Sequence, residues 1–207
     1  MREFYDALEQ FRKDDLKGYD FVRTVRRIGP EVADLLLAEV FTGGVPHEGA
    51  YGNPAWDSWK QSYLVQALGA TRSDQVIPWL EFAIHFASDL DCEGSAAEAL
   101  GEIGTETAMY ALVEGALCTG AVGDEGEAIY DVIVEHAAQT LPIIQDLLEN
   151  SGFAQNKLNT LLEICVEMGG EEWQPAKAWI KNPFWEEDDE DEDTAAEGED
   201  NVIGLSV

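Results

Sequence analysis

A 32-residue internal repeat constrains the fold of this chain more than any other feature of its sequence. When residues 62–86 are aligned with residues 94–118, Leu68 and Gly69 fall on Leu100 and Gly101. The same offset continues twice more, so that three apolar columns run through four copies. The columns are Leu68, Leu100, Val132 and Ile164; Val65, Ala97, Ile129 and Leu161; and Leu80, Leu112, Ile144 and Ala176. Such a period is typical of repeat proteins, in which stacked units bury one continuous core.

Each copy divides into two helical stretches. In residues 94–118, apolar residues recur at helical spacing up to Ile103, Gly104 suits a helix C-cap and Thr105 an N-cap. We expect Gly69 and Ser73 to play these parts one copy earlier. The sequence therefore predicts an all-α fold, an α-solenoid of about five helix pairs, with about 60–70 % helix in its ordered part and no sheet.

The best copy also carries a family resemblance. Residues 97–104 (AEALGEIG), followed by Ala108, Leu112 and Leu117, resemble the HEAT-like repeat first described in phycobilisome lyase subunits. The resemblance implies a solenoid of HEAT-like helix pairs. It implies no single activity, because such repeats serve in lyases, adaptors and scaffolds alike.

An insertion interrupts the period near the N-terminus. An earlier copy begins at Val25, and its Gly29 stands 43 residues before Arg72, which is 11 more than the period. The extra residues fall in the Gly- and Pro-rich segment 42–57, which we expect to be a non-helical loop. The loop carries three candidate binding residues, His47, Tyr51 and Trp56. Its aromatic rings either plug the core at an irregular stack or form a binding loop.

The chain is strongly and unevenly acidic. It has 42 acidic and 12 basic residues, a formal net charge of −30, and no Lys or Arg between Ser73 and Asn156. Seven of the basic residues precede Ile28. This charge disfavours binding to nucleic acid or to an anionic membrane, because both need clustered cations. It favours a basic partner, although solubility alone is the alternative.

The C-terminal segment has a different composition. We divide the chain into a helical repeat domain, 1–182, and an acidic tail, 183–207. Residues 186–200 (EEDDEDEDTAAEGED) hold 11 acidic and no basic side chains, so we expect disorder. The tail is either a solvating brush, a lure for a basic partner, or a cover for the chain's own basic end.

Three features favour a cytoplasmic location. The N-terminus is charged rather than typical of a signal peptide, and no apolar run approaches the length of a membrane span. The cysteines Cys92, Cys118 and Cys165 are odd in number, and their spacings match no zinc or redox motif. We interpret all three as small core thiols in a reducing compartment.

No motif for catalysis, cofactor or metal binding emerges. The histidines His47, His85 and His136 lack zinc spacing, and we expect His136 at a helix end and His85 on an outward face. Residues 89–94 begin like a calcium loop, but the twelfth position is Leu100, where such a loop needs a Glu. We therefore predict a protein that is not an enzyme and holds no cofactor.

A candidate binding stripe follows from the second helix of each pair. Two residues turn a helix by about 200°, so residues two positions from Leu80 should face away from the core. Carried forward by the period, the stripe comprises Pro78, Phe82, Tyr110, Glu114, Pro142 and Asp146. In solenoids these helices usually line the concave side, so we expect exposed aromatic rings beside carboxylates there. Alternatively, Phe82 and Tyr110 pack under the loop 42–57.

The leading hypothesis is an interaction module that binds a basic protein or peptide through this acidic face. It would act as an inhibitor or immunity-type protein that masks a cationic toxin or nuclease, or as a chaperone for a basic client. Two alternatives stay open. One is a subunit of a phycobilisome lyase-like enzyme with a tetrapyrrole cleft, and the other is a plain structural scaffold.

Overall fold

The computed structural model describes residues 1–41, 57–86, 90–119, 127–150, 153 and 155–181. These residues are 86 % helical and contain no strand, which confirms the all-α prediction. The helix content exceeds the predicted 60–70 %, because the connections between most described helices are short. The tail 183–207 and the loop 42–57, except Asp57, lie outside the described residues.

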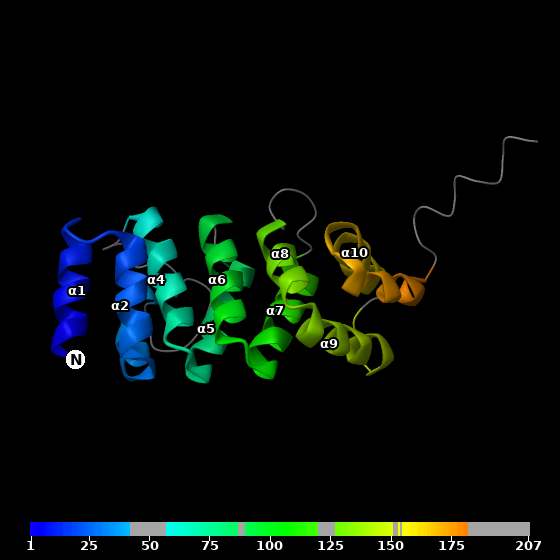
Figure 1. Cartoon of the computed structure of the whole chain (residues 1–207), viewed down its shortest axis with the longest axis horizontal. Helices are drawn as coiled ribbons and strands as arrows, with labels where there is room; N and C mark the ends of the chain where they lie inside the picture. Colours follow the sequence, from blue (N-terminus) through cyan, green and yellow to red (C-terminus); the bar gives the residue numbers. More distant parts are fainter. Residues whose placement is uncertain (42–56, 87–89, 120–126, 151–152, 154, 182–207) are drawn as a thin grey trace, which may run out of the picture.

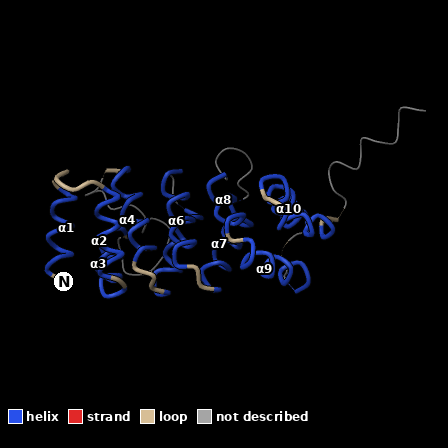
Figure 2. Tube along the Cα trace, in the orientation of Figure 1, coloured by secondary structure: helices blue, strands red, loops and turns tan. Residues whose placement is uncertain are grey.

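The helices lie side by side in two rows, which together make an elongated body (Figures 1 and 2). The first row consists of α1 (Arg2–Arg12), α2 (Gly18–Ile28), α4 (Ser58–Ala70), α6 (Leu90–Ile103), α8 (Glu127–Glu135) and α10 (Gln155–Met168). The second row consists of α3 (Ala33–Val40), α5 (Ile77–Phe86), α7 (Glu106–Thr119) and α9 (Ala137–Asn150). Short 3-10 helices precede α3 and α5, namely η1 (Pro30–Val32) and η2 (Asp74–Val76), and η3 (Glu171–Trp179) follows α10.

Contacts run along each row and between the rows. In the first row each helix packs on the next, and in the second row α3 contacts η2, α5 packs on α7, and α7 packs on α9. At the C-terminal end η3 packs on both α9 and α10. There the fully buried Trp173 donates a hydrogen bond from Nε1 to the carbonyl oxygen of Val134, over 3.2 Å.

The core between the rows contains the predicted apolar columns. Every member is buried except Ile164, which is half-buried and packs against the core. Burial of these side chains supplies the main stabilisation, at about 25 cal/mol for each Å² of apolar surface removed from water. The predicted apolar columns therefore lie in the core or against it.

Three first-row helices end on a left-handed residue at the same place in the repeat. Gly29, Arg72 and Gly104 have φ angles of 92°, 55° and 66°. Thr105 then accepts a hydrogen bond at Oγ1 from the amide of Ala108, over 3.4 Å, as predicted for an N-cap. The expectation for the preceding copy is wrong, because Arg72 takes the left-handed position instead of Gly69, and the Ser73 side chain makes no cap hydrogen bond.

Gly69 has a different role inside α4. A Cβ added there would lie 2.4 Å from the Cα of Ala99 in α6, so only glycine permits this approach of the two helices. Gly101 is the same position one copy later. A Cβ there would lie 2.8 Å from Cγ1 of Val132 in α8.

The cysteines do not all belong to the core. Cys92 and Cys165 are buried, and burial raises the pKa of the Cys165 thiol to about 12. Cys118 is exposed near the end of α7, so its prediction as a core thiol was wrong. None of the described helices is both long and apolar enough to cross a membrane.

Candidate acidic grooves

Two adjoining grooves cross the outer surface of the second row. The first has a volume of about 450 Å³ and lies between α5 and α7. It is lined by Asp74, Ile77, Pro78, Glu81, Glu106, Thr107, Tyr110, Ala111 and Glu114. The second has a volume of about 310 Å³ and lies between α7 and α9. It is lined by Glu106, Tyr110, Gln139, Pro142, Ile143 and Asp146.

The two grooves are copies of each other along the sequence. Each residue that lines the second groove stands 32 positions after one that lines the first. The pairs are Asp74 and Glu106, Pro78 and Tyr110, Thr107 and Gln139, Tyr110 and Pro142, Ala111 and Ile143, and Glu114 and Asp146. Tyr110 and Glu106 belong to both sets, because α7 forms a wall of each groove. The 32-residue period therefore relates surface residues of successive copies as well as core residues.

The predicted stripe largely coincides with these grooves. Pro78, Tyr110 and Glu114 lie together in the first groove, and Pro142 and Asp146 join Tyr110 in the second. Each groove is lined by the aromatic residue Tyr110 and by one proline, Pro78 in the first groove and Pro142 in the second. Carboxylates stand in the same grooves, as the period predicted.

The predicted exposure of the two aromatic residues is not found: Tyr110 is half-buried and packs against the core, and the prediction of Phe82 as an exposed aromatic was wrong. The Phe82 side chain is 8 % exposed and belongs to the hydrophobic core. The reason is that α5 is buried around most of its circumference, since Trp79 is also buried and its ring lies 4.6 Å from that of Phe41. A rule based on one buried stripe fails for such a helix.

Sequence reasoning missed three carboxylates of the first groove, Asp74, Glu81 and Glu106. The signal for two of them was available, because Asp74 and Glu106 are separated by the repeat period. Asp74 also accepts a hydrogen bond at Oδ1 from Oγ1 of Thr105, over 3.1 Å, which ties the start of η2 to the connection before α7. Glu81 lies outside the periodic set and has no counterpart in the second groove.

The carboxylates in the grooves repel one another. Burial raises the pKa of the Glu81 carboxyl, the Glu114 charge raises it further, and His85 opposes the rise. The pKa of the Tyr110 hydroxyl is likewise raised by burial, then by Asp146 and Glu114. No Lys or Arg is among the residues that line either groove. The grooves thus combine several carboxylates with the rings of Tyr110 and two prolines.

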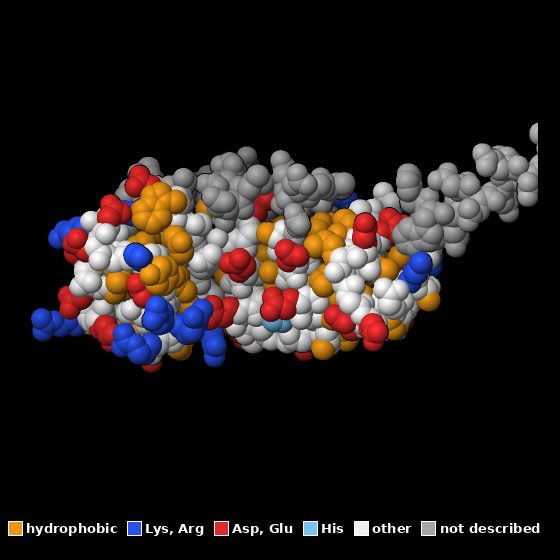
Figure 3. Space-filling model, turned by 45° about the horizontal axis from the view of Figure 1, so that its top comes forward, with side chains coloured by type: hydrophobic (Ala, Val, Ile, Leu, Met, Phe, Trp, Pro, Cys, Tyr) orange, Lys and Arg blue, Asp and Glu red, His pale blue; other side chains and the backbone are white. Residues whose placement is uncertain are grey.

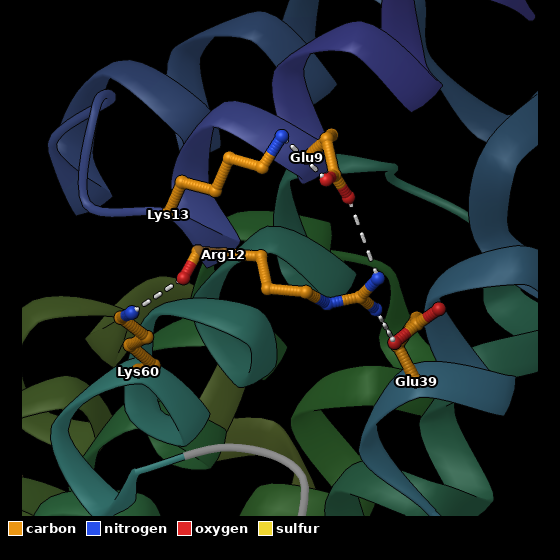
Figure 4. Close-up of polar contacts among 5 residues, drawn as sticks. All are labelled: Glu9, Arg12, Lys13, Glu39 and Lys60. Atoms are coloured by element: carbon orange, nitrogen blue, oxygen red, sulfur yellow. Dashed lines mark hydrogen bonds and ion pairs between the residues drawn. The ribbon is translucent and has the colours of Figure 1, made fainter.

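The cations of the described residues gather elsewhere. Figure 3 shows most of the visible Lys and Arg over the N-terminal end, where they are mixed with Asp and Glu; the middle of this face carries Asp and Glu, and a smaller group of cations lies toward the C-terminal end. Many of these cations are already paired. Arg12 contacts Glu39 at 3.0 Å, and Lys13 contacts Glu9 at 2.9 Å (Figure 4). Arg26 forms a two-pronged contact with Glu102 of α6, with distances of 2.5 and 2.7 Å.

A buried lysine also belongs to this N-terminal network. Lys60, only 5 % exposed, donates from Nζ to the carbonyl oxygen of Arg12, over 3.0 Å (Figure 4). The same ammonium lies 2.7 Å from Oδ1 of Asp14. It therefore joins the end of α1 to α4, and its charge is satisfied within the fold.

The other candidate residues are placed as follows. His47, Tyr51 and Trp56 lie outside the described residues. His136 stands between α8 and α9, as predicted for a helix end, with Nδ1 3.1 Å from Oε1 of Gln139. His85 is half-buried on α5. Within the described ranges, no group of three His, Cys, Asp or Glu side chains could hold a metal ion.

Comparison of the chain with protein-family models, with curated proteins and with solved structures found no match.

Proposed function

We propose that the protein is an interaction module that binds a basic protein or peptide in the two grooves of the second row. The observation that carries this proposal is the pair of equivalent grooves, each lined by ring side chains and carboxylates and by no cation. A Lys or Arg of the partner would meet opposite charge and an aromatic face together. An inhibitor that masks a cationic protein and a chaperone for a basic client both use this interaction.

The proposal includes the architecture. We interpret the two rows as an α-solenoid of about five HEAT-like pairs: α2 with α3, α4 with α5, α6 with α7, α8 with α9, and α10 with η3. Support comes from the buried columns of the 32-residue repeat and from contacts that run chiefly between neighbouring helices. Solenoids of this kind bind extended partners along a face built from successive repeats. The acidic tail, 183–207, is a separate segment in this proposal.

The chemistry of the grooves suits a guanidinium or ammonium group. A cation over an aromatic ring gains about 0.5–1 kcal/mol at an exposed site and more when desolvated. A nearby carboxylate adds charge pairing, which speeds association and fixes the orientation of the partner. Tyr110 offers its ring to both grooves, while Glu114 and Asp146 flank it. We therefore expect Tyr110 to dominate the binding energy.

The test is a binding titration with a fluorescent Arg-rich peptide over a series of salt concentrations. Wild type should bind, and the affinity should fall steeply with salt, because the attraction is between exposed charges. The double change Tyr110→Ala and Glu114→Lys should weaken binding at least about tenfold, or about 1.4 kcal/mol.

The matched control places the same charge reversal in the other row. Asp131→Lys changes an exposed carboxylate of α8, which lines neither groove. This control should keep most of the affinity. A folded double variant with wild-type affinity would remove the grooves as the binding site.

A further inference from the structure

We infer that the partner segment is a polyproline II chain with a Lys or Arg at every third residue. This inference rests on the proposed function, since it specifies the ligand of the same grooves. Its basis is the equivalence of the two grooves. Each of the six residues that line the second groove stands 32 positions after a residue that lines the first. Equivalent sites that are one repeat apart select a ligand with equivalent groups at the same spacing.

The arrangement of side chains defines the path of such a ligand. Pro78, Tyr110 and Pro142 occupy the same position in the 32-residue repeat, on α5, α7 and α9. Pro78 and Tyr110 line the first groove and Tyr110 and Pro142 the second, so these rings define a track across the three helices. Carboxylates flank the track on both sides. Asp74 and Glu106 lie toward the start of their helices, and Glu114 and Asp146 lie one turn beyond the rings. A chain that follows the rings passes a carboxylate pair in each groove.

The spacing of packed helices decides which backbone conformation fits. Neighbouring helix axes lie about 8–10 Å apart, so the two grooves are separated by a similar distance. A polyproline II chain turns once in three residues and advances about 9 Å, so side chains three apart share a face at this spacing. In an extended strand, side chains on one face lie about 7 or 13 Å apart. Neither spacing equals the distance between the grooves, so a strand that places one basic side chain in one groove would place no other in the second.

An α-helix is the remaining geometry to compare. Residues seven apart on a helix are separated by about 10.5 Å, which also matches the distance between grooves. However, a helix with its side chains is about 10–12 Å wide, whereas each groove is bounded by two helices already in contact. A polyproline II chain is narrower, and its proline rings pack well on an aromatic ring such as that of Tyr110, which lines both grooves. This shared aromatic ring therefore favours polyproline II.

The experiment compares peptides of equal charge in a fluorescence anisotropy titration. One peptide repeats Arg-Pro-Pro four times, a second has the same composition with its arginines two or four residues apart, and a third is an Ala-rich helix with four arginines seven apart. The first should bind about tenfold more tightly than the second. Glu106→Gln, which alters the carboxylate that lines both grooves, should reduce this preference. The matched control Asp131→Asn should retain it.

The outcomes separate this inference from the function on which it rests. Equal affinity for the first two peptides would overturn the spacing rule while the binding of basic peptides stands. Tightest binding of the helical peptide would replace polyproline II with an α-helical partner. Failure of all three peptides to bind would overturn the proposed function as well.

Discussion

The Cα of Ala99 lies 2.4 Å from the position that a Cβ on Gly69 would occupy, so α4 and α6 are in backbone contact at this point. We predict that Gly69→Ala lowers the free energy of unfolding by about 3 kcal/mol, at the upper end of overpacking effects, because a backbone cannot rotate away as a side chain can. Urea denaturation followed by circular dichroism measures the change.

The control for this prediction is the equivalent glycine one repeat later. In Gly101→Ala the new methyl would meet Cγ1 of Val132, which is a side-chain atom and can shift. The cost should therefore be smaller than that of Gly69→Ala. Equal costs for the two variants would mean that the backbone approach at Gly69 does not set the packing of α4 on α6.

Arg72 is predicted to be a strained helix end. Its φ angle of 55° costs a non-glycine residue about 1–2 kcal/mol, part of which glycine would recover despite its greater freedom in the unfolded chain. Arg72→Gly should therefore raise the free energy of unfolding by up to about 1 kcal/mol. Arg72→Ala removes the same charge and keeps the strain, so it should give no such gain. A loss of stability in Arg72→Gly would contradict the assignment.

Leu100 tests the continuity of the core. Its side chain is fully buried in the column that runs from Leu68 to Val132. Leu100→Ala should lower the free energy of unfolding by about 2–5 kcal/mol, because the change removes apolar contacts and leaves a cavity. Thermal and urea denaturation both measure this effect. A change below about 0.5 kcal/mol would show that the columns do not form the core.

The pKa of Glu81 predicts how stability depends on pH. Since burial and Glu114 raise the pKa of Glu81 above 4.5 in the folded state, the folded chain holds this proton more tightly than the unfolded chain. Its contribution to stability is full below pH 4.5 and is lost as the pH rises through the folded pKa. Glu81→Gln should therefore raise the melting temperature more at pH 7 than at pH 4. A background of Glu114→Gln should shrink this difference, and an equal effect at both pH values would contradict it.

The sequence predicts the periodic part of the molecule well. The buried columns, the Gly104 and Thr105 helix ends, and the placement of Tyr110, Glu114 and Asp146 all follow from the 32-residue period. These positions are predictable because each copy repeats the same local physics: an apolar residue is buried between rows, and one at about 200° from it faces outward.

The predictions that were wrong concern residues whose neighbours differ from one copy of the repeat to the next. Phe82 is buried because α5 is enclosed on more sides than α7 or α9, which depends on the contact of Trp79 with Phe41. Gly69 looks like a helix end, yet its role depends on how closely α6 approaches. Cys118 lies in an apolar stretch but on its outward side. The burial or role of each of these residues depends on how another helix packs against it, which the sequence around the residue does not specify.

An amide chemical-shift map of the 22.8 kDa protein, recorded while the Arg-rich peptide is added, locates the binding site residue by residue. We predict the largest changes at residues 74–81 and 106–114 and around Asp146, with little change at Asp131 on the other row. Changes confined to the acidic tail at 186–200, or to the helices of the N-terminal end, would contradict binding in the grooves.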